Sequence, residues 1–408
     1  MMFAPDLRSE MRWLSSGFLL MLYSGFGQTY FIALFAGQLK SDLAISDGEF
    51  GGLYTIGTLA SAALLTWLGK LADTLSIRWL GAGVIGGLAV TSLAMASVAS
   101  PLMLAFVLFG LRFFGQGMLT HTSMTAMARW FNRKRGRAVS IAGLGLPASE
   151  GLMPPLAVAI AATVGWRETW LLSAAFLLLV AAPLFIFLLK HERHPTLGPM
   201  HSATAAADED RHQWTRREVL RHPLFYALLP GVLASPFIVT AIFFNQVTLV
   251  QIKGWQLGWF AATFPLMAGV HVVCALAAGW LVDRFGSRHL LSVFLAALGL
   301  ATLILTFASS RYSLIVVMTL IGFALGFVSS TSGALWAELY GTAHLGAIRS
   351  VTTAAVVLAT AVAPGLVGVL LDAGVAFETQ SLVMAIYCFV AALGMLMLIP
   401  KLNRLATM

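Results

Sequence analysis

Long runs of apolar residues, separated by short polar or charged segments, recur along the whole chain. A helix needs about 20 mostly apolar residues to cross the roughly 30 Å hydrocarbon core of a bilayer, and twelve runs approach or exceed that length. They lie near 14–36, 50–68, 79–98, 102–128, 138–163, 168–190, 224–250, 257–280, 289–308, 312–337, 347–371 and 380–400. This pattern predicts an all-α membrane protein with twelve transmembrane helices.

The composition supports this interpretation. Hydrophobic residues make up 59% of the 408 positions and charged residues only 10%, whereas a soluble domain carries about a quarter charged residues. If both termini are cytoplasmic, the Lys and Arg residues gather on the cytoplasmic side, and the opposite face holds only Lys40, Arg167, Lys253 and Arg311. Because such a bias orients membrane proteins, it predicts cytoplasmic termini and argues against a nucleic-acid-binding surface as the source of the net charge of +8.

A charged motif occurs twice, each time in the short gap between two apolar runs. Gly69-Lys-Leu-Ala-Asp73-Thr-Leu-Ser-Ile-Arg78 returns about half a chain later as Gly279-Trp-Leu-Val-Asp283-Arg284-Phe-Gly-Ser-Arg288. The segments 117–123 and 326–332 repeat at a similar offset. The duplication predicts a six-helix bundle over residues 1–190, a linker over 191–221 and a second six-helix bundle over 222–408. Parallel halves of this kind place a substrate site between them near the bilayer midplane.

The linker is polar and rich in histidine. Five of the nine histidines fall in or beside it, at positions 191, 194, 201, 212 and 222. They lack a fixed spacing, so a solvated linker is favoured over a metal site, and we expect no metal and no cofactor. A short basic helix is expected at 215–220, on the membrane surface. Cys274 and Cys388 lie inside predicted spans, so no disulfide is implied.

The repeated charged motif resembles the loop 2–3 signature of the major facilitator superfamily, and the resemblance covers all twelve spans. The first copy departs from that signature at Ser76 and Ile77. The resemblance implies two pseudo-symmetric bundles with cytoplasmic termini. It further implies that Asp73 caps the start of the eleventh span near Arg349, and Asp283 the start of the fifth, holding the cytoplasmic side closed. The alternative is that both aspartates are ordinary turn residues. The expected gating residues are Gly69, Asp73, Arg78, Gly279, Asp283, Arg284, Arg288, Glu338 and Arg349, with a salt bridge between Glu338 and Arg349.

A narrower resemblance involves residues 129–167. Trp130-Phe-Asn-Arg-Lys-Arg-Gly-Arg-Ala138, followed by Gly165-Trp-Arg167, is similar to bacterial relatives of the monocarboxylate and oxalate/formate transporters. That branch usually carries an arginine in the eighth span that binds the substrate carboxylate. Ala275 stands at that position here, and His271 stands where an acidic partner is sometimes found. A neutral, zwitterionic or aromatic cargo therefore stays as open as a carboxylate.

Arg112 lies near the middle of the fourth span, where a charged side chain is costly. With Gln116, Thr120 and Ser123 it forms one polar stripe at helical spacing. Two interpretations are open. In the first, Arg112 lines a cavity, where it orients an anionic or polar cargo or tunes a nearby proton site. In the second, it is a structural arginine whose donors are satisfied by carbonyls of neighbouring helices. The other candidate substrate-binding residues are Gln28, Tyr30, Tyr54, Asn245, Gln246 and Ser330.

Two titratable residues are predicted at comparable depth in the facing fifth and eighth spans. Glu150 lies in a Gly- and Pro-rich fifth span and His271 in the eighth. One hypothesis is that they form a pair between the halves that couples protons to opening. The alternative is that each is satisfied within its own half. His121, near the end of the fourth span, is a weaker candidate for proton coupling.

These features predict a secondary active transporter of the inner membrane, not an enzyme. It would move a small organic solute by alternating access, in symport with protons or by exchange with a counter-substrate. The sequence shows neither a phosphate-binding P-loop nor a zinc-hydrolase motif. A proton-driven exporter of amphipathic compounds and a non-transporting receptor with the carrier fold are the alternatives. Membrane lipids are the other expected partners, and a monomer is the expected working unit.

Overall fold

The computed structural model describes residues 10–131, 134–191, 193 and 212–406, all helices and connecting turns, with no strand in those ranges. Eleven helices in this part of the chain are long and apolar enough to cross a membrane. A twelfth span is formed if the bent pair Met11–Gly27 and Thr29–Leu43, at 42° to one another, is counted as one. The prediction of an all-α membrane protein is confirmed. The predicted linker histidines 194 and 201, and residues 132 and 133 of the Trp130 motif, lie outside the described residues.

Contacts group the chain into two compact units. The first comprises Met1–Met200 together with Phe244–Thr248, and the second comprises His201–Phe243 and Leu249–Met408. The predicted boundaries of the linker stay a prediction, since most of it is not described.

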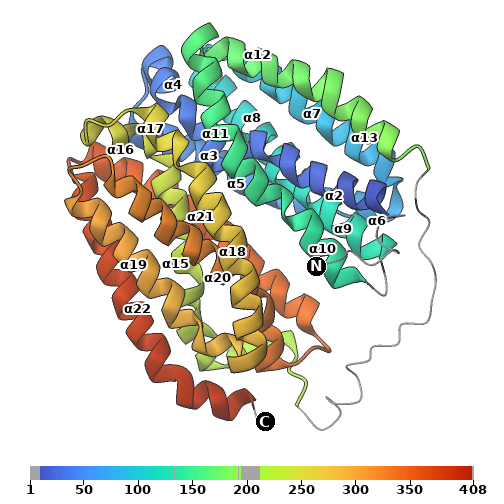
Figure 1. Ribbon diagram of the computed structural model, residues 1–408, viewed down its shortest axis with the longest axis vertical. Coiled ribbons are helices and arrows are strands. Elements are labelled where there is room, and N and C mark those ends of the chain that lie inside the picture. The colour runs from blue at the N-terminus through green and yellow to red at the C-terminus, as the bar shows by residue number, and fades with distance from the viewer. Residues whose placement is uncertain (1–9, 132–133, 192, 194–211, 407–408) are drawn as a thin grey trace. The chain divides into compact units, whose positions relative to one another are not determined.

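The first unit holds the helices that precede the linker (Figure 1). The α-helices are α2 (Met11–Tyr23), α3 (Thr29–Ile32), α4 (Ala36–Leu43), α5 (Asp47–Leu68), α6 (Leu71–Thr74), α7 (Ile77–Ala96), α8 (Pro101–Gly110), α9 (Thr120–Trp130), α10 (Arg135–Gly143), α11 (Gly145–Val164), α12 (Trp166–Phe176) and α13 (Ala182–Leu188). Short 3₁₀ turns are η1 (Ser24–Gly27) and η2 (Ala33–Phe35), and π-helical turns are η3 (Leu111–Leu119) and η4 (Leu177–Ala181). Within this unit α12 packs along α7, and α2 packs against α10 and α11.

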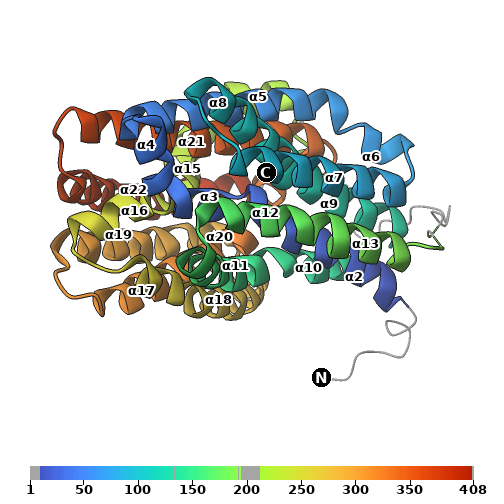
Figure 2. The ribbon, with the colours of Figure 1, turned by 90° about the horizontal axis from the view of Figure 1, so that it is seen from above.

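Apart from residues 244–248, which belong to the first unit, the second unit holds α14 (Arg216–Arg221), α15 (Pro223–Phe244), α16 (Gln246–Ile252), α17 (Leu257–Ala262), α18 (Phe264–Phe285), η6 (Ser287–His289), α19 (Leu291–Phe307), α20 (Ser313–Tyr340), α21 (Leu345–Asp372) and α22 (Phe377–Ala406). Helix α18 packs along α20, and α19 lies against both α20 and α22. The neighbourhood of α19 and α22 is visible in both views (Figures 1 and 2).

Polar residues at the ends of the apolar runs define where the helices begin. Ser46 and Glu49 form a capping box at the start of α5, in which each side chain accepts a hydrogen bond from the other residue's backbone N–H. Ser100 caps α8, whose first residue is Pro101. These contacts satisfy backbone N–H groups that have no partner inside a helix.

The end of the linker is anchored within the second unit. The Gln213 side-chain carbonyl accepts hydrogen bonds from the backbone N–H groups of Thr342 and Ala343, at 2.9 and 3.0 Å. The basic helix predicted at 215–220 is present as α14, and the Thr215 backbone N–H and hydroxyl lower the pKa of the capping Glu218 carboxyl. Burial also lowers the pKa of His222, which follows α14.

The first span is interrupted at its centre by a close crossing of two glycines. Turn η1 ends at Gly27, and Gln28 is extended, with φ −85° and ψ 154°. A Cβ atom at Gly27 would lie 2.1 Å from the Leu111 carbonyl oxygen, and one at Gly115 would lie 2.6 Å from the Gly27 Cα. The backbones of η1 and η3 therefore touch, which only glycine permits.

We expect Gly115→Ala to destabilise the protein by about 1–3 kcal/mol, because the added methyl group meets backbone that cannot move aside. The matched control is Gly52→Ala in α5, where a Cβ would meet nothing within 4 Å. That change should raise stability by up to about 1 kcal/mol through helix propensity. Urea unfolding in detergent measures both. Equal stability of the two variants would show that the crossing is not close-packed.

Candidate functional site

Arg112 is fully buried, with 0% of its surface exposed, in the π-helical turn η3. Its Nη1 donates a hydrogen bond of 3.1 Å to the Gly27 carbonyl oxygen, at the interruption of the first span. The centre of its guanidinium lies 5.1 Å from the centre of the Tyr54 ring. A carbonyl oxygen and an aromatic face thus stabilise the charge from within the first unit.

The Tyr54 ring links Arg112 to residues after the first-span interruption. The Tyr54 and Thr29 hydroxyls share a hydrogen bond of 2.5 Å. The next residue, Tyr30, donates from its hydroxyl to the Ser149 Oγ of α11 at 2.8 Å. All of these side chains belong to the first unit, and Tyr54 and Tyr30 are buried.

The segment 244–248, which breaks the seventh span, packs with the first unit. The centre of the Phe244 ring lies 4.7 Å from the centre of the Tyr54 ring and 4.9 Å from that of the Phe50 ring. The Gln246 Nε2 donates to the Tyr30 carbonyl oxygen at 2.8 Å, and the Thr248 hydroxyl donates to Asp47 at the start of α5 at 2.8 Å. Predicted site residues Arg112, Tyr54, Tyr30 and Gln246 therefore come together in one network, and Asn245 is buried beside Gln246.

The network contains polar atoms that are buried without a partner. The Nε and Nη2 atoms of Arg112 have no acceptor among the described residues, and the Gln246 Oε1 has no donor among them. Nε and Nη2 form one edge of the guanidinium, which can donate two parallel hydrogen bonds to a carboxylate. Leaving such groups buried and unpaired costs about 1–3 kcal/mol each. A ligand that pairs with these atoms of Arg112 and Gln246 would therefore gain binding free energy there.

The remaining predicted substrate-binding residues, Gln28, Gln116 and Ser330, are described outside the Arg112 network. Gln116 and Gln28 are half-buried, and the Gln28 amide lies 3.5 Å from the Ser24 hydroxyl. In the second unit, the Ser330 hydroxyl donates to the carbonyl of Ala275 at 2.8 Å. Ala275 is the position at which the resembled branch carries its arginine, so a serine hydroxyl of α20 lies close to it.

The three candidate proton-coupling residues lie in three different helices: Glu150 in α11, His271 in α18 and His121 in α9. Glu150 directly follows Ser149 in α11, and its side chain is 9% exposed. His271, also 9% exposed, lies in α18 of the second unit. The His121 Nε2–H donates to the Gly69 carbonyl oxygen at 3.1 Å, at the end of α5. That bond holds the first charged turn and supports a structural role for His121.

The two copies of the charged motif make different side-chain contacts. In the second copy, Gly286 adopts a positive φ of 84°. The Glu338 carboxylate then accepts hydrogen bonds from the Ser287 backbone N–H, at 2.6 Å, and from the Ser287 hydroxyl, and it pairs with Arg288 at 2.7 Å. In the first copy, Arg78 lies over the neighbouring Trp79 ring, with 5.0 Å between the guanidinium and ring centres.

The predicted salt bridge between Glu338 and Arg349 is wrong. Glu338 pairs with Arg288, and Arg349 donates instead to the Gly333 carbonyl oxygen. The left-handed turn at Gly286 brings Ser287 and Arg288 to Glu338, and this geometry was not visible in the linear sequence. Asp73 and Asp283 are exposed on their own units, and Arg284 lies over the Trp280 ring. Whether the aspartates cap helices of the other half stays a prediction.

Comparison with known proteins decides the family. The family model described as Major Facilitator Superfamily matches residues 17–272 and 256–406. The chain belongs to this superfamily. It is 25% identical over 323 residues to the MFS transporter asaE of Aspergillus flavus, covering 78% of this chain and 70% of that protein. It is also 24% identical over 189 residues, 45% of this chain and 43% of the relative, to the uncharacterized MFS-type transporter YcxA of Bacillus subtilis.

Solved structures show the same fold. A bacterial homologue of the human lysosomal transporter Spinster superposes with a TM-score of 0.69 at 15% identity, over 97% of this chain and 99% of that one. The nucleoside transporter NupG gives a TM-score of 0.70 at 14% identity, over 95% and 98%. As a member of this superfamily, the chain is a multi-pass membrane protein with a role in membrane transport.

Three partners in the site were missed by sequence reasoning: the Gly27 carbonyl, the Thr29 hydroxyl and the Ser149 hydroxyl. Two signals were present. Gly25 and Gly27 interrupt the first apolar run, and Gly115 and Gly117 lie on either side of Gln116 in the fourth. Small residues at such positions permit close helix contact, but they do not reveal which carbonyl becomes free to bind an arginine.

Two substitutions of Tyr54 separate its ring from its hydroxyl. Both Tyr54→Phe and Tyr54→Leu lose the hydrogen bond with Thr29, but only Tyr54→Leu loses the aromatic face under Arg112. We expect Tyr54→Leu to be less stable than Tyr54→Phe by about 2 kcal/mol, since a desolvated cation–π contact and part of the Phe244 packing are removed. Thermal unfolding in detergent provides the measurement. Equal melting temperatures would show that the ring does not stabilise the charge.

Proposed function

We propose that this chain is a secondary active transporter that moves a small organic anion, with a carboxylate as the recognised group, by alternating access. The observation that carries the proposal is the free edge of the Arg112 guanidinium within the network of Tyr54, Tyr30 and Gln246. A buried cation in a membrane span is costly and marks functional sites. Discontinuous helices recur at the substrate sites of transporters, and π-helical turns are frequent at functional sites.

Arg112 would replace the arginine that the eighth span lacks. Ala275 offers no charge at that position, and the nearby Ser330 hydroxyl is bonded to the backbone. Arg112 is anchored through Nη1 to Gly27, so its Nε and Nη2 edge has a fixed direction. A ligand carboxylate would accept two parallel bonds from that edge, and a ligand donor would satisfy the Gln246 Oε1.

Proton coupling would involve Glu150 and His271. Glu150 follows Ser149, which accepts the hydrogen bond from Tyr30, so a charge change at Glu150 would be felt one residue away from the network. His271 would meet it from the second bundle, and protonation of either residue would change the preference for open or closed states. The inner membrane is the proposed location, and Asp73 and Asp283 would stabilise the state closed to the cytoplasm.

The proposal is tested first by thermal stabilisation of the purified protein with monocarboxylates, dicarboxylates, amino acids, nucleosides and lipophilic cations. A ligand at 100 times its Kd stabilises the folded state by about 2.7 kcal/mol. We expect carboxylates to stabilise the wild type and to lose the effect in Arg112→Gln. Arg112→Lys, which keeps the charge but not the two-donor edge, should bind weakly even if the glutamine variant folds poorly. Carboxylate stabilisation that survives in Arg112→Lys unchanged would contradict the proposed contact.

An exporter of amphipathic compounds is the second candidate, and one feature of the first unit favours it. A groove of about 460 Å³ between α2, α11 and α12 is lined almost entirely by apolar side chains, with Phe26, Phe31 and Phe176 among them. Stabilisation by lipophilic cations alone would select this function. Counterflow in proteoliposomes separates either carrier from a receptor, because a receptor binds the ligand without exchanging it.

Proton coupling predicts a specific pH response. Uptake into proteoliposomes should depend on pH, because protonation of a coupling residue changes the preference for open or closed states. Glu150→Gln and His271→Ala should each flatten that profile while leaving ligand-induced stabilisation in place. If both variants keep the wild-type profile, the pair does not couple protons.

A further inference from the structure

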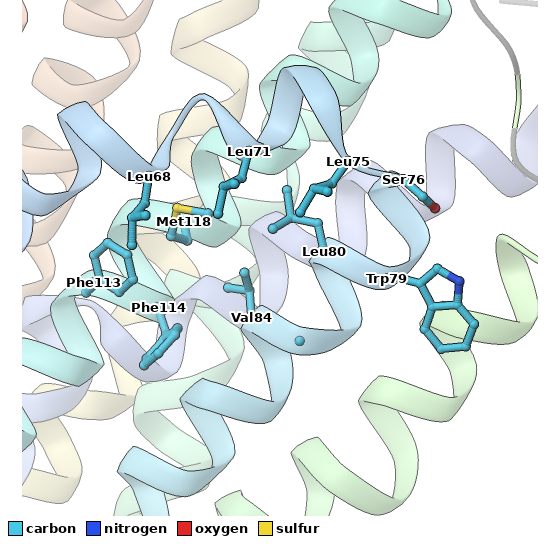
Figure 3. Close-up of a pocket in the computed structure, with 11 residues that line it drawn as sticks. Leu68, Leu71, Leu75, Ser76, Trp79, Leu80, Val84, Phe113, Phe114 and Met118 are labelled. Carbon is cyan, nitrogen blue, oxygen red and sulfur yellow. The ribbon is translucent and has the colours of Figure 1, made fainter.

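A second apolar groove lies in the first unit, on the charged turn that precedes α7. It has a volume of about 480 Å³ and runs between the end of α5, α6, α7 and η3. Apart from the Ser76 hydroxyl and the Trp79 indole N–H, its lining is apolar, and it includes Leu68, Leu80, Val84 and Phe114 (Figure 3). These helices belong to membrane spans, so a groove of this kind is suited to an acyl chain.

An exposed tryptophan and basic side chains lie beside the groove, on the charged turn and at the start of α7. Trp79 lines the groove and is 62% exposed, and the Arg78 guanidinium lies 5.0 Å from its ring. Exposed tryptophans are typical of the membrane–water interface. The Arg78 Nε–H is buried and has no acceptor among the described residues. Lys70 is exposed on the same turn, where Asp73 is the acidic residue, so the cations of the turn outnumber its anion.

We propose that this groove binds an anionic phospholipid, with one acyl chain along the apolar lining and the phosphate at Arg78. The combination selects a lipid over other apolar ligands, because an apolar groove between candidate membrane spans and an arginine beside an exposed tryptophan match the two ends of the same molecule. Basic pockets between membrane helices bind acidic lipid headgroups in this way. The Arg78 guanidinium can donate charge-assisted hydrogen bonds to phosphate oxygens.

The lipid would also support the turn that carries Arg112. Phe113 and Phe114, the two residues after Arg112, line the groove from η3. A chain packed against them fills the space beside the π-helical turn, whereas an unfilled groove leaves those side chains without contacts on that side. Binding at the groove is thereby coupled to the stability of η3.

The test uses delipidated protein in detergent, titrated with dioleoyl phosphatidylglycerol or with dioleoyl phosphatidylcholine. The two lipids share their acyl chains and differ in net charge. Melting temperature and the number of lipids bound in native mass spectrometry are measured. Gly83→Leu fills the groove, since Gly83 lines it and a Cβ there would meet nothing within 4 Å. Gly86→Leu is the matched control, because Gly86 has equal space on the same helix but does not line the groove.

We expect phosphatidylglycerol to raise the melting temperature more than phosphatidylcholine in the wild type and in Gly86→Leu. Gly83→Leu should lose the lipid-dependent rise with both lipids. Arg78→Gln should bind phosphatidylglycerol about five-fold more weakly, the factor that about 1 kcal/mol per basic residue gives, and should bind phosphatidylcholine unchanged. Equal stabilisation by the two lipids in the wild type, or a full response in Gly83→Leu, would overturn the proposal.

Discussion

The hydrogen bond from Arg112 to the Gly27 carbonyl is the contact on which the candidate site depends. It requires two departures from regular helix: an interruption of the first span that frees the carbonyl, and a π-helical turn that directs the arginine. Both are possible because Gly27 and Gly115 let the two backbones touch. A membrane offers no water to an unpaired backbone group, so such a break is tolerated only where another group satisfies it.

The Arg112 anchor organises the side chains around it. The Tyr54 ring lies against both Arg112 and Phe244, and Gln246 bonds to the backbone of Tyr30. The short segment 244–248 thus contacts the same tyrosines, Tyr54 and Tyr30, that belong to the network around Arg112. A ligand held by the free edge of Arg112 would act on this segment through those contacts, and binding would thereby be linked to the break in the seventh span.

The sequence predicted the class of fold because hydropathy alone determines which segments cross a bilayer. It also predicted Arg112, Tyr54, Tyr30 and Gln246 as individual candidates, since polar residues in apolar spans are conspicuous. It could not predict their contacts. The apolar run at 14–36 continues on both sides of Gln28, so hydropathy does not reveal that the helix is interrupted there. The pairing of Glu338 with Arg288 depended on the positive φ of Gly286, which no periodicity reveals.

In the proposed site, the buried guanidinium edge of Arg112 would recognise a carboxylate by charge and by two parallel hydrogen bonds. Calorimetric titration of the purified protein with a binding carboxylate, and with the corresponding primary amide of nearly the same shape, tests this recognition. We expect the amide to bind at least about ten-fold more weakly, because charge-assisted hydrogen bonds are roughly twice as strong as neutral ones. Equal affinity for the acid and the amide would show that Arg112 stabilises the fold and does not select the cargo.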